Sequence, residues 1–158
     1  MAALVNSLAE LGWLEPVNIP DKEDTEKIWA WLSANTKSRY IEFVANAHYS
    51  VKWDKETREK TKPIIMNRLK GDKDIDLMIA MGTWAGQDMA NNDHSVPVIV
   101  CSVSDALASK IVKSVEDSGY DHVNAHLDPA RYVRQIYAFH DVIGFKKLGV
   151  AFQDTVDG

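Results

Sequence analysis

The segments IDLMIAMGTWAGQ (75–87) and PVIVCSVSDA (97–106) decide the fold of this chain. Each begins as a short apolar run and then stops at small and polar residues. Short apolar runs bounded by turn residues are typical of strands that lie buried in a parallel sheet. A third run, KLGVAF (147–152), has the same character. The sequence therefore predicts strands at 75–81 and 97–103, and a further strand at 147–152.

Helical patterns separate these runs. We expect helices at 2–12, 23–35, 54–70, 84–92, 106–118 and 129–143, and one more strand at 40–45. Asp128 and Pro129 are suited to the N-cap and the first turn of the last helix. Strands that alternate with helices predict an α/β fold, a three-layer sandwich around a mostly parallel sheet of the flavodoxin or Rossmann type.

Length and charge limit the classes of function. The chain has 158 residues, which suits a single lobe over residues 1–158. Its formal net charge of −5 argues against nucleic acid as a partner, because phosphate backbones are usually bound by basic surfaces. No apolar run is long enough to span a membrane, so we expect no transmembrane helix. The first residues lack the basic region of a secretory signal, so we expect no such signal in this sequence. The single cysteine, Cys101, does not indicate a compartment.

Two strand ends are the candidate binding site. Thr83 and Trp84 follow the first predicted strand, and Ser104 and Asp105 follow the second. Ligands of open parallel sheets bind beyond the carboxyl ends of the strands, so these residues are expected to face one crevice. Thr83 either caps the next helix, or lies beside the free amides of that helix start where they bind a carboxylate or phosphate. Trp84 either forms a wall of the binding pocket or packs against the preceding helix. Asp105 either caps a helix or pairs with a ligand ammonium group.

Catalytic and metal-binding patterns were not found in the sequence. Cys101 lies within an apolar strand and reads as a buried structural thiol. His122 and His126 are four residues apart, but that stretch is poorly helical and lacks the further ligands of a zinc site. The glycine patterns of P-loops, dinucleotide sites and nucleophile elbows are missing as well. We therefore expect a binding protein without catalytic residues, cofactor or metal.

Four stretches carry a resemblance to a known family. DLMIAMGTWAGQ (76–87) resembles the segment DLIVAIATPAAQ of a group of ABC-transporter substrate-binding proteins, some of which bind aromatic amino acids. VPVIVCSVSD (96–105) is similar to that group's IPVVFTAVTDP, and KKLGVAFQ (146–153) to its KKIGVLYN. Residues 124–128 correspond in place to its NVTGVSD, although only Asn and Asp persist. Order and spacing agree over roughly residues 1–154.

The resemblance implies a type-1 periplasmic-binding fold, in which two α/β lobes close on a solute. It implies that Thr83 and Asp105 contact the ligand, an amino acid, and that the partner is the permease of an ABC importer. It also implies a periplasmic or membrane-anchored extracellular location. Departures from the family pattern, such as Trp84 in place of a proline, leave the identity of the ligand open. The alternatives are a ligand-sensing domain of a regulator or receptor, and a small Rossmann-like enzyme.

The chain is also expected to be a fragment. The resemblance covers the first lobe without its opening strand, and residues 147–158 correspond to the start of the second lobe. Half of a clamshell predicts weak or undetectable binding of amino acids. A missing central strand predicts that 147–152 fills its place, within the chain or by exchange in a strand-swapped homodimer. The expected strand order is then 39–45, 147–152, 76–81 and 97–103.

Overall fold

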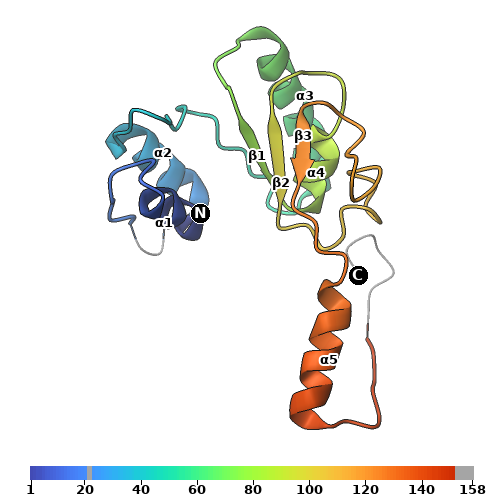
Figure 1. Ribbon diagram of the computed structural model, residues 1–158. Helices are drawn as coiled ribbons and strands as arrows, with labels where there is room; N and C mark the ends of the chain where they lie inside the picture. Colours follow the sequence, from blue (N-terminus) through green and yellow to red (C-terminus); the bar gives the residue numbers. More distant parts are fainter. Residues whose placement is uncertain (21–22, 152–158) are drawn as a thin grey trace. The chain divides into compact units, whose positions relative to one another are not determined.

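A computed structural model describes residues 1–20 and 23–151 of the chain. It contains two compact units, Met1–Ile65 and Met66–Gly158, which are described separately below. The helices are α1 (Ala2–Glu10), α2 (Thr25–Asn35), α3 (Lys55–Gly71), α4 (Thr83–Met89) and α5 (Arg131–Ile143). The strands are β1 (Met78–Met81), β2 (Val98–Cys101) and β3 (Val123–Ala125) (Figure 1).

The first unit is built around α1 and α2. The carboxylate of Asp24 accepts a hydrogen bond of 2.9 Å from the amide of Lys27, and this N-cap starts α2. The two helices contribute apolar side chains to a common core, which consists of Val5, Leu14, Ile28, Leu32 and Phe43. Both helices thus confirm the helices expected from the sequence near 2–12 and 23–35.

The segment 40–45 is not a strand, and that prediction was wrong. Phe43 inserts into the core of the first unit. Its ring meets the ring of Trp29 edge to face, with 5.3 Å between the ring centroids. The indole nitrogen of Trp29 donates a 2.9 Å hydrogen bond to the carbonyl of Val44. The apolar and aromatic residues of this segment therefore pack against α2 instead of pairing with a neighbouring strand.

The second unit contains a parallel sheet with the strand order β1-β2-β3. Met78 lies opposite Val98, Met81 lies opposite Cys101, and Val98 lies opposite Val123. The strands β1 and β2 confirm the two apolar runs as parallel strands. With the helices, they establish the α/β class expected from the sequence. The strand β3 was not predicted.

The two faces of the sheet differ in burial. Val98 and Val100 are almost completely buried, as is Ala80 on β1, and α4 packs against β1 and β2. Gly86 makes this close approach possible, because a Cβ atom there would lie 2.8 Å from side-chain atoms of Val100 and Ile111. Residues alternate along a strand, so the intervening apolar side chains point to the other face. On that face Leu77, Ile79, Met81 and Ile99 are exposed.

The helix expected at 106–118 does not form, and a single turn takes its place. The amide of Lys110 donates to the carbonyl of Leu107, and the amide of Ile111 donates to the carbonyl of Ala106. Lys110 adopts the left-handed conformation, with φ of 56°. This pattern of two bonds is the Schellman motif, which ends a helix at the residue with positive φ. Ile111 is fully buried, so core packing favours the early end.

Two further expectations were wrong at the C-terminal end. The N-cap of α5 is Ala130 instead of Asp128, because the carboxylate of Asp128 binds the guanidinium of Arg134. Residues 147–151 form no strand within the chain, and Leu148 and Val150 are exposed. The expected strand order therefore does not occur within the described chain. Phe152 lies outside the described residues, and exchange of the segment with a neighbouring chain stays a prediction.

Candidate functional site

The three strands end at one edge of the sheet, which is the edge where the sequence places the binding site. The amide of Gly82 donates a 2.8 Å hydrogen bond to the carbonyl of Cys101, just past the ends of β1 and β2. The amide of His126 donates a 2.9 Å bond to the carbonyl of Val100. These bonds hold the segments that follow β1, β2 and β3 next to one another at their carboxyl ends.

Thr83 and Trp84 lie at the end of β1. The N-cap of α4 is Gly82, whose φ of 92° suits glycine, so the alternative in which Thr83 is the cap is wrong. Thr83 is the first residue of α4, and 5% of its surface is exposed. Trp84 is half-buried. Gly82 has no side chain to cap the first turn, and the buried residue Thr83 follows it directly.

Ser104 and Asp105 lie at the end of β2, and both are exposed. One carboxylate oxygen of Asp105, Oδ1, accepts hydrogen bonds of 2.9 Å from the amides of Leu107 and Ala108. Asp105 therefore caps the single turn that replaces the expected helix. An exposed carboxylate at a strand end also carries a negative charge toward any ligand at this edge, so capping and ligand binding are compatible.

A third junction at this edge was missed because β3 was missed. It consists of His126, Leu127 and Asp128, which follow Ala125 at the end of β3. The hydrogen bond from the Arg134 guanidinium holds the pKa of Asp128 below its usual value. The resemblance of residues 124–128 to a family motif was the signal in the sequence that could have located this junction.

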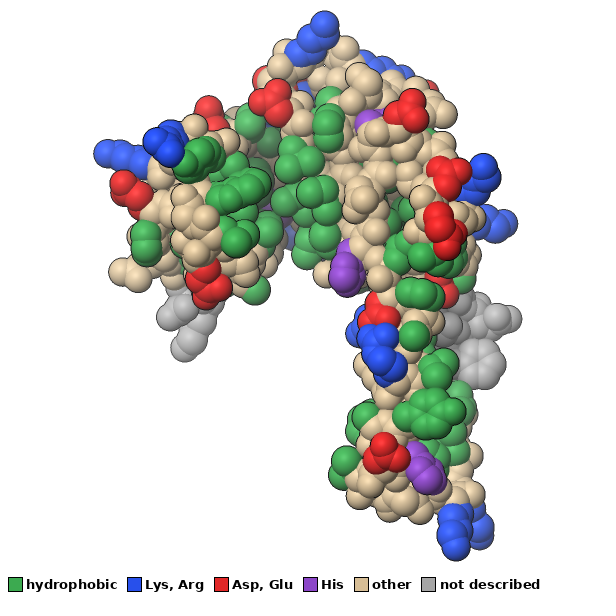
Figure 2. Space-filling model, in the orientation of Figure 1, with side chains coloured by type: hydrophobic (Ala, Val, Ile, Leu, Met, Phe, Trp, Pro, Cys, Tyr) green, Lys and Arg blue, Asp and Glu red, His purple; other side chains and the backbone are tan. Residues whose placement is uncertain are grey.

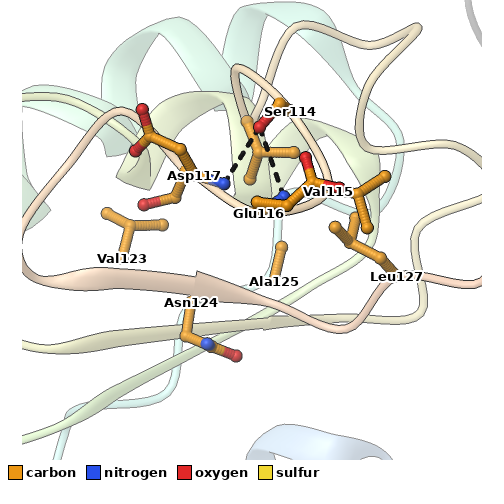
Figure 3. A pocket seen from close by; sticks show the side chains of 10 residues that line it. Ser114, Val115, Glu116, Asp117, Val123, Asn124, Ala125 and Leu127 are labelled. Carbon is orange, nitrogen blue, oxygen red and sulfur yellow. Dashed lines mark hydrogen bonds between the residues drawn. The ribbon is translucent and has the colours of Figure 1, made fainter.

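A small cavity lies on the other side of β3 from the exposed sheet face. Its volume is about 240 Å³, and it is lined by the loop at 112–118 and by residues of β3 and Leu127 (Figure 3). The hydroxyl of Ser114 accepts hydrogen bonds from the amides of Glu116 and Asp117 within this loop. Figure 3 shows the side chain of Asn124 pointing away from the cavity. None of the four predicted site residues lines it.

Two histidines of the second unit, His94 and His122, pack against each other. The rings of His94 and His122 meet edge to face at 4.9 Å, and the ring of Tyr120 lies 6.3 Å from that of His122. The Nε2 atom of His94 bonds the carbonyl of Met89, which can only accept, so Nε2 carries the proton. Burial lowers the pKa of His94. Among residues 1–20 and 23–151, His, Cys, Asp and Glu do not form a cluster of three that could hold a metal ion.

Comparison with known families identifies the chain. A model of the family "ABC transporter substrate binding protein" matches residues 40–137, which include β1, β2, β3 and both predicted junctions. The chain belongs to this family. No curated protein and no solved structure matches the chain. Within the described part of this substrate-binding protein, the helices are too short or too polar to cross a membrane.

Proposed function

We propose that this chain forms one lobe of the solute-binding component of an ABC importer, and that it binds a small solute such as an amino acid without chemical change. The observation that carries the proposal is the family match over residues 40–137, which spans the carboxyl edge of the sheet. The partners are the solute and the importer permease, at the periplasmic or extracellular side of the membrane. Residues 147–158 are then the beginning of a second lobe.

The binding residues in this proposal are Thr83, Trp84, Ser104 and Asp105. The exposed carboxylate of Asp105 pairs with the ammonium group of the amino acid, while its Oδ1 atom keeps the two cap bonds. The solute carboxylate faces the junction that follows β1, where Thr83 begins α4. Trp84 is half-buried and supplies an aromatic wall for the solute side chain.

The test is titration of the isotopically labelled chain with amino acids, followed by NMR chemical shifts. One lobe offers half of the contacts of a closed site, so we expect weak binding, with a Kd on the order of 1 mM. The amides of residues 82–85 and 104–105 should shift together. Sugars at equal concentration serve as the control ligand. Shifts confined to other parts of the sheet, or none at tens of millimolar, would contradict the proposed site.

Asp105→Asn separates binding from capping. The amide oxygen of asparagine caps nearly as well as a carboxylate, so stability is expected to stay within about 0.5 kcal/mol of the parent chain. The negative charge is lost, so the shifts caused by amino acids should disappear. Unchanged shifts in this variant would show that Asp105 does not bind the ammonium group. Micromolar or tighter binding by a monomer would contradict the single-lobe part of the proposal.

A further inference from the structure

Two histidine rings meet inside the second unit, at the amino end of its sheet. His94 lies in the connection between α4 and β2, and His122 directly precedes β3. The ring centroids are 4.9 Å apart, and 7% of the surface of His94 is exposed. The carbonyl of His122 accepts a 2.8 Å hydrogen bond from the amide of Val98, the first residue of β2. We call these two rings the histidine pair, and it lies where two neighbouring strands begin.

Each ring of the histidine pair has a buried nitrogen without a hydrogen-bond partner among the described residues. These atoms are Nδ1 of His94 and Nε2 of His122. Because Nε2 of His94 donates to the carbonyl of Met89 at 3.1 Å, Nδ1 holds a lone pair. A proton taken up by His94 therefore adds to Nδ1, inside the unit. It creates a positive charge that is removed from water, and this removal disfavours the charged form of the ring.

The surroundings of His94 favour the neutral ring. Burial is the largest influence and lowers the pKa of His94, and the neighbouring ring of His122 lowers it further. The backbones of Met89 and Val96 and the carboxylate of Asp93 act in the opposite direction, but the pKa remains below its usual value. Protonation of His94 therefore favours any state of the chain in which its ring reaches water.

The ionisable side chains near the histidine pair compensate a positive charge only weakly. The carboxylate of Asp93 lies 3.7 Å from the ammonium group of Lys70 on α3, so part of its negative charge is already balanced. The ring of Tyr120 lies 6.3 Å from that of His122 and contributes an aromatic contact, while Asp121 is exposed. On the face shown in Figure 2, the acidic side chains of the second unit are scattered, and some lie beside basic ones.

We propose that the histidine pair is a pH-sensitive switch at the amino end of the sheet, and that proton uptake by His94 separates the connection between α4 and β2 from the segment before β3. Main-chain bonds at this end run from the amide of Met78 to the carbonyl of Pro97 and from the amide of Val98 to the carbonyl of His122. The opened form exposes the rings to water and binds protons more readily, so acid increases its population. The switch lies at the end of the strands opposite to the candidate site and requires no solute.

The experiment is amide hydrogen exchange of the full chain by NMR, between about pH 7.5 and about pH 5. The amides of Met78 and Val98 report the amino end of the sheet, and those of Gly82 and His126 report the carboxyl end. Protection of the amino-end amides should fall by up to about tenfold per pH unit below about pH 6.5, and it should level off where the His94 ring titrates. The carboxyl-end amides should keep their protection. A loss that is not confined to the amino end, or no loss at all, would overturn the proposal.

His94→Gln removes the titrating group but keeps a side-chain N–H that can donate to the carbonyl of Met89. The acid-induced loss of protection should disappear in this variant. His140→Gln is the matched control, because His140 is exposed on α5, and this variant should respond to acid as the parent chain does. If His94→Gln does not fold, NMR titration of the histidine rings in the parent chain decides the question. A His94 ring that titrates at about pH 6.5 or above, or an unchanged acid response in His94→Gln, would exclude the switch.

Discussion

Gly86→Ala tests how closely α4 packs on the sheet. A Cβ atom at residue 86 would lie 2.8 Å from Cδ1 of Ile111 and from Cγ1 of Val100, and both residues are fully buried. Carbon atoms pack best at about 3.5–4.0 Å, so each contact overlaps by roughly 1 Å. The side chain of Val100 is stiff at χ1 and cannot turn away cheaply. Overpacking of this kind costs about 1–3 kcal/mol, whereas alanine in a helix gains about 1 kcal/mol over glycine. We expect a net loss of about 1 kcal/mol.

The assay is urea unfolding together with hydrogen exchange of the β2 amides, which reports the opening free energy of the sheet itself. The control is Gly71→Ala at the end of α3, where a Cβ atom meets nothing within 4 Å. This control should be neutral or slightly stabilising. Ile111→Val removes one of the two clashing atoms, so its cost should be smaller beside Gly86→Ala than in the parent chain.

The reasoning would be refuted if Gly86→Ala were as stable as the parent chain or more stable. That result would mean that the helix gain exceeds the overlap, and that α4 lies farther from β2 than the structure places it. Additive effects of Gly86→Ala and Ile111→Val would likewise contradict the direct contact.

Three further changes probe single local features. Asp105→Ala removes the cap bonds and should cost about 1 kcal/mol in urea unfolding, whereas Asp105→Asn should not; equal losses would contradict the cap. Lys110→Gly relieves the left-handed backbone and should stabilise the chain by up to about 1 kcal/mol in the same assay, so a destabilised variant would exclude the Schellman ending. Burial lowers the pKa of His94 in the folded state, so the unfolded state binds more protons, and stability should fall as pH decreases from about 6.5 toward the folded pKa. His94→Gln should flatten this pH dependence of unfolding, and an unchanged slope would assign it to other groups.

Local sequence patterns were sufficient to predict the elements whose own consecutive residues favour one type of secondary structure. The runs at 75–81 and 97–103 are short, apolar and bounded by turn residues, so the strands β1 and β2 could be predicted together with their parallel pairing. The helix α2 follows from the spacing of its apolar residues, and α5 was located from Asp128 and Pro129, although Ala130 is its N-cap. The edge where the candidate site lies follows from these elements, because polar residues come directly after both strands.

Tertiary contacts decided the remaining elements. Strand β3 has only two apolar residues, Val123 and Ala125, and it is a strand because its backbone pairs with β2. The segment 40–45 has the composition of a strand, yet Phe43 packs against Trp29 of α2 instead. A strand requires a partner for its backbone hydrogen bonds, and local sequence does not specify where that partner lies.

The candidate site shows the same division. The sequence by itself determined that Thr83, Trp84, Ser104 and Asp105 follow strands of one parallel sheet. Only the tertiary structure decided that Thr83 is buried while Asp105 is exposed, and that the turn after Asp105 ends at Lys110. The reason is that burial of Ile111 competes with continuation of a helix from 106 to 118, and the gain from core packing exceeds the small helix preference of each residue.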